Sequence, residues 1–320
     1  MSPQERFSLI MSRQSRFAWG DPYLPSVLAV PREAPRGSRV SRLLSRKLGR
    51  TIHTLSTPER VFTQFALFHP KLVDIHEQRM LWPYRSPHPL HGHPLHKGTF
   101  FSPVRGTTEI AQEIGLKHHE ITVDQPDGTR VRLPFPYQGD LLLYLCGDDG
   151  APYALNWSVK DRFAAFGERR LSDSKTVVQQ RKDREHAELR TELEELYYAS
   201  AGIRTVHMAL DNFDSCVQGN LDLLFPMHGL SLAHDTELLD EFSLEVAQAV
   251  HRGDPVAYVA VSYGNRWGAR DEFITRIYQD IWERKLPVNL FEPILIDHPL
   301  NTEDKDLLDV YGACFLEATP

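Results

Sequence analysis

A carboxylate and an amine, Asp140 and Lys160, stand on either side of one short turn sequence. The turn is GDDG at 147–150, a composition typical of β-hairpin loops, and apolar β-rich segments flank it. Asp140 lies seven residues before the turn, and Lys160 lies ten residues after it. Folding of the hairpin therefore predicts that the two side chains meet at its open end.

Such a pair suits metal-assisted cleavage of a phosphodiester bond. Carboxylate oxygens are ligands that Mg²⁺ prefers, and an ammonium group neutralises charge on the phosphate or assists the attacking water. A second carboxylate comes from Glu59, since the sequence STPE at 56–59 predicts a helix start. Thr57 is the predicted N-cap residue and Glu59 lies in the first turn.

Two further positions on the second strand of the hairpin belong to the same expected site. Strand alternation puts Ser158 on the same face as Lys160, and the backbone carbonyl of Val159 lies between them. The expected metal ligands are Glu59, Asp140, Val159 and Ser158, for one or two ions of Mg²⁺ or Mn²⁺. The expected catalytic residues are Glu59, Asp140 and Lys160.

The elements that would position these residues follow from apolar spacing and turn signals. Val61, Phe62, Phe65 and Phe68 recur at helical spacing after the predicted helix start. Further helices are predicted at 109–114 and 184–199, and further strands at 51–55, 71–75, 119–124, 129–133 and 203–210. The polar segment 161–185 is expected to be mobile. Helix, strands, helix and strand in this order predict an α/β fold with a mixed sheet flanked by helices.

Charge and composition divide the chain into three predicted parts: an arm at 1–50, a nuclease domain at 51–212 and a C-terminal domain at 213–320. The proline-rich arm is predicted to be irregular, and residues 1–60 hold 11 Lys and Arg against 4 Asp and Glu. This excess suits contact with DNA phosphates, although a solvated flexible arm has the same composition. The expected DNA-binding residues are Arg36, Arg39, Arg42, Arg46, Lys47 and Arg50.

The C-terminal part has a different character. Helices are predicted at 238–251 and 271–284, a β-rich segment at 256–262 and extended chain at 286–296, which together suggest a winged-helix-like domain. Residues 213–320 hold 7 Lys and Arg against 19 Asp and Glu. Because this region is acidic, a protein partner is expected for it rather than non-specific DNA.

Several separated segments resemble TnsA, the endonuclease subunit of Tns-type heteromeric transposases. The resemblance runs from about Tyr23 to Asp211. Its blocks are Tyr23-Leu-Pro25, Leu55-Ser-Thr-Pro-Glu59, Val73-Asp-Ile-His-Glu-Gln78, Ile110-Ala111, Gly115-Leu-Lys-His118, Gly139-Asp140, Val159-Lys160, Glu192-Leu-Glu-Glu-Leu-Tyr-Tyr198 and Gly202-Ile203. The resemblance implies a restriction-endonuclease-like nuclease domain and a winged-helix-like C-terminal domain. It also implies cleavage of the non-transferred strands (the 5′ ends) at transposon ends, with a TnsB-like DDE transposase and a TnsC-like AAA+ regulator as partners.

Position by position, the resemblance matches Glu59 to the catalytic glutamate on a helix, Asp140 to the metal-binding aspartate and Lys160 to the catalytic lysine. Glu194 matches an acid on a later helix and is expected to support the site. Ser158 departs from the pattern, because the family usually has Gln or Glu there. A hydroxyl is a poorer and shorter ligand than a carboxylate, so weaker binding of one metal ion is expected.

Other residues compete for these roles. Glu77 follows a predicted strand and is the alternative to Glu59 as metal ligand; Glu59 is preferred for its helix position, and Glu77 and Gln78 are expected to line the substrate groove. The histidines of the Pro-rich loop at 82–97 suggest zinc, but no Cys lies nearby, so a solvated or phosphate-facing loop is preferred.

The predicted function is therefore a Mg²⁺-dependent DNA endonuclease within a transposase complex. Its rivals are a free-standing restriction or repair nuclease and a non-catalytic scaffold that joins DNA to partner proteins. The chain has no run of 18 apolar residues and its N-terminus lacks the pattern of a secretory signal. We expect a DNA-associated protein of the bacterial cytoplasm, with Cys146, Cys216 and Cys314 as reduced core residues.

Overall fold

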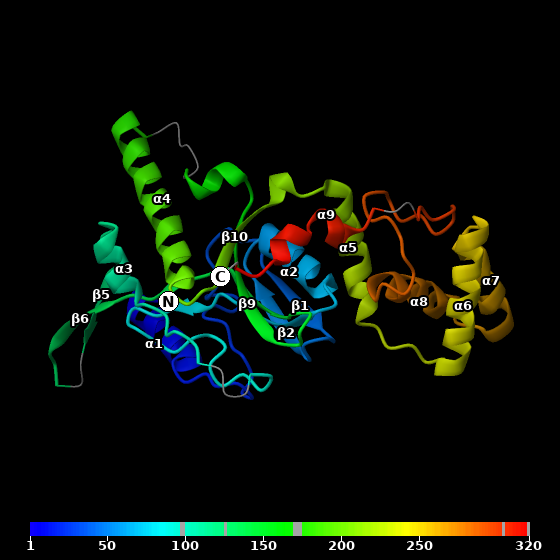
Figure 1. The fold of residues 1–320 in the computed structure, drawn as a ribbon, viewed down its shortest axis with the longest axis horizontal. Coiled ribbons are helices and arrows are strands. Elements are labelled where there is room, and N and C mark those ends of the chain that lie inside the picture. The colour runs from blue at the N-terminus through cyan, green and yellow to red at the C-terminus, as the bar shows by residue number, and fades with distance from the viewer. Residues whose placement is uncertain (97–99, 125–126, 169–174, 303–304, 319–320) are drawn as a thin grey trace.

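A small mixed sheet with helices on both faces lies at the centre of the computed structural model (Figure 1), which describes residues 1–96, 100–124, 127–168, 175–302 and 305–318. Its helices are α1 (Pro3–Gln14), α2 (Thr57–Phe68), α3 (Thr107–Glu113), α4 (Val177–Ala199), α5 (Ser215–His228), α6 (Thr236–Arg252), α7 (Val256–Trp267), α8 (Arg270–Trp282) and α9 (Leu307–Val310), with 3₁₀ turns at Phe163–Phe166, Leu210–Asn212 and Gly312–Phe315. Its strands are β1 (Ser41–Ser45), β2 (Arg50–Thr54), β3 (Leu72–Glu77), β4 (Met80–Leu81), β5 (Glu120–Asp124), β6 (Arg130–Pro134), β7 (Tyr137–Gln138), β8 (Leu141–Cys146), β9 (Pro152–Lys160) and β10 (Arg204–Ala209).

The central sheet has the strand order β10-β9-β8-β3. Strand β8 runs antiparallel to both of its neighbours, β3 and β9, whereas β10 runs parallel to β9. A parallel neighbour needs a crossover, and α4 supplies it between β9 and β10. The predicted α/β class with a mixed sheet and flanking helices is confirmed at this level.

The two faces of the sheet belong to different helices. Leu141, Leu143 and Leu145 of β8 are buried in one hydrophobic cluster with α2, whereas Leu142 and Tyr144 are buried in a second cluster with α4. Alternation along a strand explains this division, since successive side chains point to opposite faces. The apolar run before GDDG is therefore a strand buried on both sides, and the predicted hairpin of β8 and β9 is confirmed.

Two helix starts differ from their predicted positions. Helix α2 begins at Thr57, and its N-cap is Ser56, whose hydroxyl accepts a hydrogen bond from the Glu59 backbone N–H. The predicted N-cap Thr57 is thus one residue late, although Glu59 does lie in the first turn. Helix α4 begins at Val177, within the segment expected to be mobile, because Thr176 and Gln179 form a reciprocal cap there.

The prediction of an irregular N-terminal arm is wrong over α1 and β1. Ser2 and Glu5 form a capping box with Pro3 in the first turn, a helix-start signal that the sequence contains. After α1, Tyr23 and Val27 are buried, so this part of the chain packs onto the rest of the molecule.

The β-ribbon expected in the C-terminal region is absent from its described part. No strand occurs within 213–302 or 305–318, and the segment predicted to be β-rich forms α7. Its buried residues Val256, Val259, Ala260 and Tyr263 recur at helical spacing, so α7 is an amphipathic helix. Helix α5, which the sequence analysis missed, is capped by Asp214. The predicted wing of a winged helix is therefore wrong here.

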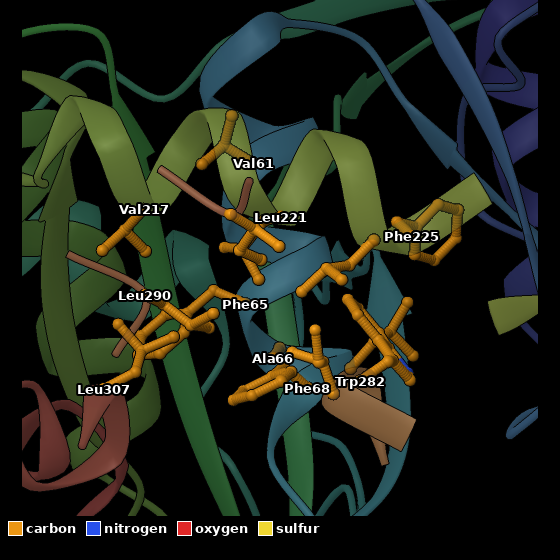
Figure 2. Close-up of a cluster of buried hydrophobic side chains, with 14 of the residues drawn as sticks. Val61, Phe65, Ala66, Phe68, Val217, Leu221, Phe225, Trp282, Leu290 and Leu307 are labelled. Carbon is orange, nitrogen blue, oxygen red and sulfur yellow. The ribbon is translucent and has the colours of Figure 1, made fainter. Parts of the chain in front are cut away.

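A single buried cluster crosses the predicted boundary between 212 and 213. Figure 2 shows α2 residues Phe65 and Phe68 beside α5 residues Leu221 and Phe225, with Trp282 of α8 among them. Helices α6, α7 and α8 form one end of the elongated molecule, and α4 with the β5–β6 hairpin lies toward the other (Figure 1). The C-terminal helices are thus joined to the sheet through α2 and α5.

No helix in the described ranges combines the length and apolar character that a membrane span requires. Cys146, Cys216 and Cys314 are free thiols, and each is half-buried rather than fully inside the core.

Replacing Leu221 by alanine tests the shared core. Leu221 is fully buried, so the cavity should lower the free energy of unfolding by about 2–5 kcal/mol. Urea unfolding followed by tryptophan fluorescence and far-UV circular dichroism measures it, and both probes should report one transition. Leu244→Ala, at a residue of α6 that is 62% exposed, is the control and should change stability by less than about 0.5 kcal/mol. Two separated transitions would show that 213–320 folds independently.

Candidate active site

Asp140 lies at the end of the central sheet, immediately before β8. In the hairpin register Leu141 lies opposite Trp157, which brings Asp140 beside the last residues of β9. Its Oδ2 atom accepts hydrogen bonds from the Val159 backbone N–H at 2.7 Å and from the Lys160 ammonium at 3.1 Å. The open end of the hairpin thus brings Asp140 and Lys160 into direct contact, as the turn spacing predicts.

Glu59 reaches the same place from the first turn of α2. Its Oε2 atom accepts hydrogen bonds from the Leu55 backbone N–H at 2.9 Å and from the Gln78 amide at 2.8 Å, and its Oε1 atom accepts one from the Ser56 hydroxyl at 2.8 Å. The side chain is 8% exposed. Burial, and then repulsion from Asp140, raise the pKa of Glu59 to about 7 despite these hydrogen bonds.

Lys160 is the cation among these carboxylates. Its ammonium also donates to the Val159 carbonyl oxygen at 3.0 Å and lies 5.5 Å from the centre of the Phe166 ring. Burial disfavours its charge, but the negative charges of Asp140 and Glu194 outweigh burial and raise the pKa of Lys160. It is therefore a charged donor rather than a neutral base.

Glu194 of α4 lies behind the hairpin, on the face opposite to α2. It accepts hydrogen bonds from the Asn156 amide at 2.9 Å and from the Ser158 hydroxyl at 3.3 Å. Burial, and then the charge of Asp140, raise its pKa. Ser158 is 3% exposed and does not line the groove described next. The hydroxyl expected to bind metal thus donates to Glu194 of α4 and does not face the groove.

An open groove of about 890 Å³ runs past the three predicted catalytic residues. Glu59, Asp140 and Lys160 line it together with Val159, and so do Arg36 and Arg39 from the loop before β1. Both arginines are exposed. Two of the expected DNA-binding residues therefore lie at the same groove as the carboxylates, although 100 residues lie between Arg39 and Asp140 in the chain.

The other expected DNA-binding residues lie elsewhere. Arg42 and Arg46 are exposed on and after β1. The Lys47 ammonium donates to the carbonyl oxygens of His69 and Pro70 at 2.7 and 3.1 Å. Arg50 is half-buried and forms an ion pair with Glu77 at 3.0 Å. Its internal ion pair makes Arg50 a structural residue rather than a free phosphate contact.

Glu77 and Gln78 do not line the groove, which corrects their expected role. Glu77 is fully buried and is bound by Arg50 and by the His53 backbone N–H at 3.0 Å. Gln78 is buried in a left-handed backbone conformation with φ of 41°, which is strained for a residue with a side chain. There its backbone N–H donates to the Asp140 carbonyl at 2.9 Å and its amide holds Glu59. Gln78 thus connects the two carboxylate positions.

Gly139, directly before Asp140, has almost no room for a side chain. A Cβ atom there would lie 3.1 Å from the Tyr198 hydroxyl oxygen and 3.5 Å from Glu194 Oε1. The absence of a side chain lets the chain pass close to α4 and places Asp140 at the mouth of the groove.

The histidines of the Pro-rich loop make local contacts. The ring of His88 stacks on that of Phe101, with 4.5 Å between the ring centres. The ring of His93 lies edge-on to that of Trp19, with 4.3 Å between the ring centres. Within the described ranges, no group of three or more His, Cys, Asp or Glu residues is arranged to hold a metal ion. Lys97, at the end of this loop, lies outside the described residues.

The carboxylates of Glu59 and Asp140 line the groove beside Val159, whose backbone carbonyl is a further oxygen donor. Mg²⁺ and Mn²⁺ accept such hard oxygens, and Mg²⁺ often uses only one or two carboxylates and keeps several waters. The repulsion that raises the pKa of Glu59 is what a bound cation would relieve. These residues therefore fit one hydrated divalent ion.

Sequence reasoning missed Arg190 of α4. Its guanidinium carbon lies 3.8 Å from the centre of the Tyr137 ring, and its charge acts on Glu194 and Asp140. The signal was its position one helical turn before Glu194, on the same face of a predicted helix.

Comparison with models of known protein families and with curated proteins finds no match for this chain. The resemblance to TnsA rests on the sequence blocks quoted above.

Replacing Glu59 by glutamine tests the charge state of this carboxyl. The amide oxygen of glutamine can replace Glu59 Oε2 as acceptor, and its amide nitrogen, in place of Oε1, can donate to the Ser56 hydroxyl oxygen. In the native chain without metal, the folded-state pKa is about 7, above the ordinary 4.5. Glu59 therefore stabilises fully only below about pH 4.5, and this contribution disappears as the pH rises through 7.

The expected result is that Glu59→Gln gains stability relative to wild type as the pH rises from about 5 to about 8, by up to about 3 kcal/mol. Chemical denaturation across that pH range measures it. Glu237→Gln, in the first turn of α6 and exposed, is the matched control and should show no such trend. A stability difference that does not change with pH would exclude the raised pKa.

Proposed function

We propose that this chain is a divalent-metal-dependent DNA endonuclease, and that it acts as a TnsA-like subunit that cuts the non-transferred strands at transposon ends. One observation carries the nuclease proposal: Glu59, Asp140 and Lys160 come from three separate elements and line one open groove, with Arg36 and Arg39 beside them. Carboxylates and a charged amine beside exposed guanidinium groups are what cleavage of a phosphodiester requires.

The order of elements supports a restriction-endonuclease-like assignment of this domain. Helix α2, strands β3, β8 and β9, helix α4 and strand β10 follow one another, and the β8–β9 hairpin carries Asp140 and Lys160 at its open end. The sequence pattern predicts this order of a helical Glu, a strand Asp and a later Lys. Helix α3 and the β5–β6 hairpin, which lie between β4 and β7 in the chain, extend the domain without interrupting the sheet.

In the proposed reaction, water attacks the scissile phosphorus and the P–O bond to the leaving oxygen breaks. Lys160, held by Asp140 and the Val159 carbonyl, would donate a hydrogen bond to a non-bridging phosphate oxygen and stabilise the charge that develops there. Asp140 is oriented by the Val159 N–H, and Glu59 by Gln78 and Ser56. The bound Mg²⁺ or Mn²⁺, held by Glu59, Asp140 and Val159, would supply Lewis-acid stabilisation of the phosphate.

Arg36 and Arg39 would bind the DNA backbone beside the cleaved bond. Exposed guanidinium groups bind phosphates well, but phosphate contacts carry no sequence information. Selection of the transposon end would therefore come from partners, a TnsB-like DDE transposase and a TnsC-like AAA+ regulator, as the resemblance implies. The acidic surface of 213–320 favours a protein partner there.

Asp140→Asn tests the reaction. Loss of one negative charge should leave the fold intact but lower the rate of Mg²⁺-dependent nicking of transposon-end DNA, in the presence of the partner proteins, at least about 100-fold. Lys160→Met should have a similar effect. The control is Asp148→Asn, in the exposed turn at the other end of the same hairpin. If Asp140→Asn cleaves normally, the nuclease proposal is wrong; if both variants and the wild type assemble but none cleaves, a scaffold is favoured.

Metal binding can be measured without cleavage. Mg²⁺ or Mn²⁺ should raise the Tm of the wild-type protein, and more at about pH 8 than at about pH 6, because Glu59 must lose its proton to bind. The increase should be strongly reduced in Asp140→Asn and unchanged in Asp148→Asn. An equal increase in all three proteins would place any bound ion elsewhere.

A further inference from the structure

A second cleft, separate from the groove of the candidate active site, includes Tyr137, three residues before Asp140. It encloses about 670 Å³, between the start of β5, the end of β6 and the middle of α4. Lys117, Arg132 and Arg190 line it, together with Tyr137 and the acid Glu120. Lys117 and Arg132 are exposed. The cleft therefore carries an excess of positive charge.

Arg190 is the partly buried member of this set. Its guanidinium lies over the ring of Tyr137, with 3.8 Å from Cζ to the ring centre, which holds the planar group in place. Its Nη1 atom is buried and has no hydrogen-bond partner among the described residues. A buried, unpaired N–H donor costs free energy, and a guanidinium more than a neutral group. An arginine fixed in this way is prepared for an anion that supplies the missing acceptor.

Two short stretches of the chain connect residues of the cleft with residues of the candidate active site. Tyr137 lies three residues before Asp140, and Arg190 lies one helical turn before Glu194. The charges of Glu194 and Asp140 act on Arg190, which also places the guanidinium close to the carboxylates. In Figure 1 the β5–β6 hairpin and α3 lie beside one end of α4. The cleft and the candidate active site are therefore built from neighbouring residues of the same two segments.

We propose that the cleft binds a phosphate of the DNA backbone, on the strand that passes through the groove, with Arg190 as the partly buried anchor and Lys117 and Arg132 at the rim. This inference rests on the proposed nuclease function. Arginine presents a planar set of donors that matches two phosphate oxygens, and lysine adds a point charge. Neither the sequence pattern nor the resemblance assigns a ligand to Arg190 or Arg132. Arg190 and the cleft would position the DNA, whereas Lys160 acts at the bond that is cut.

The test measures binding of a short transposon-end DNA duplex to the full chain, by fluorescence anisotropy, without divalent cations and over a range of salt. Arg132→Gln and Lys117→Gln should each weaken binding several-fold, and each should reduce the slope of log K against log salt by about 0.9. The matched control is Arg130→Gln, since Arg130 is on the same strand, pairs with Asp124 and does not line the cleft. It should bind like the wild type.

Arg190→Gln should weaken binding at least as much as the rim variants. Its far-UV circular dichroism and Tm will show whether it folds, and the rim variants keep the test valid if it does not. The proposal is wrong if Arg132→Gln and Arg130→Gln bind equally, or if a folded Arg190→Gln binds like the wild type. Both outcomes differ from failure of the nuclease proposal, in which the cleft variants bind weakly but the wild-type protein with its partners cleaves no DNA.

Discussion

The negative charge of Asp140, close to two other carboxyl groups, is the constraint on which the rest of the candidate site depends. Burial first, and then the charge of the Asp140 carboxylate, raise the pKa of Glu59 and of Glu194. Asp140 itself forms an ion pair with Lys160 at 3.1 Å. Crowding of partly buried carboxylates costs free energy unless cations or hydrogen-bond donors surround them. The structure supplies those donors from backbone N–H groups and from Ser56, Gln78 and Asn156. The remaining imbalance is the physical reason to expect a bound cation between Asp140 and Glu59.

Holding this arrangement requires elements that are far apart in the sequence. Helix α2 has two roles: its first turn carries Glu59, and its later turns pack against α5 in the shared core of Figure 2. The C-terminal helices therefore contribute to the placement of Glu59 without touching the groove. Gln78 has a similar role, since it stays in a strained conformation while it holds both carboxylate positions. Such strain persists only where the surrounding structure enforces it.

Positive charge lies on both sides of these carboxylates. Arg36 and Arg39 reach the groove from the N-terminal loop, and Arg190 lies beyond Tyr137 in the adjoining cleft. A DNA strand in the proposed complex would meet cations before and after the carboxylates. Position within the basic stretch does not by itself make an arginine available to DNA. Arg50 belongs to this stretch, but its charge is paired with Glu77. Burial and pairing, rather than local charge density, determine which cations can bind phosphate.

The sequence alone determined the features that depend on neighbouring residues. Turn composition and alternation predicted the β8–β9 hairpin and the meeting of Asp140 with Lys160, and the STPE start put Glu59 in the first turn of α2. Tertiary structure decided what depends on distant partners. It turned Ser158 toward Glu194, buried Glu77 against Arg50 and brought Arg39 to the groove. It also left the Nη1 atom of Arg190 without an acceptor among the described residues. The local sequence pattern specifies the type of each helix or strand and its capping residues. The packing of separate elements decides which surface a side chain faces and whether its charge is paired.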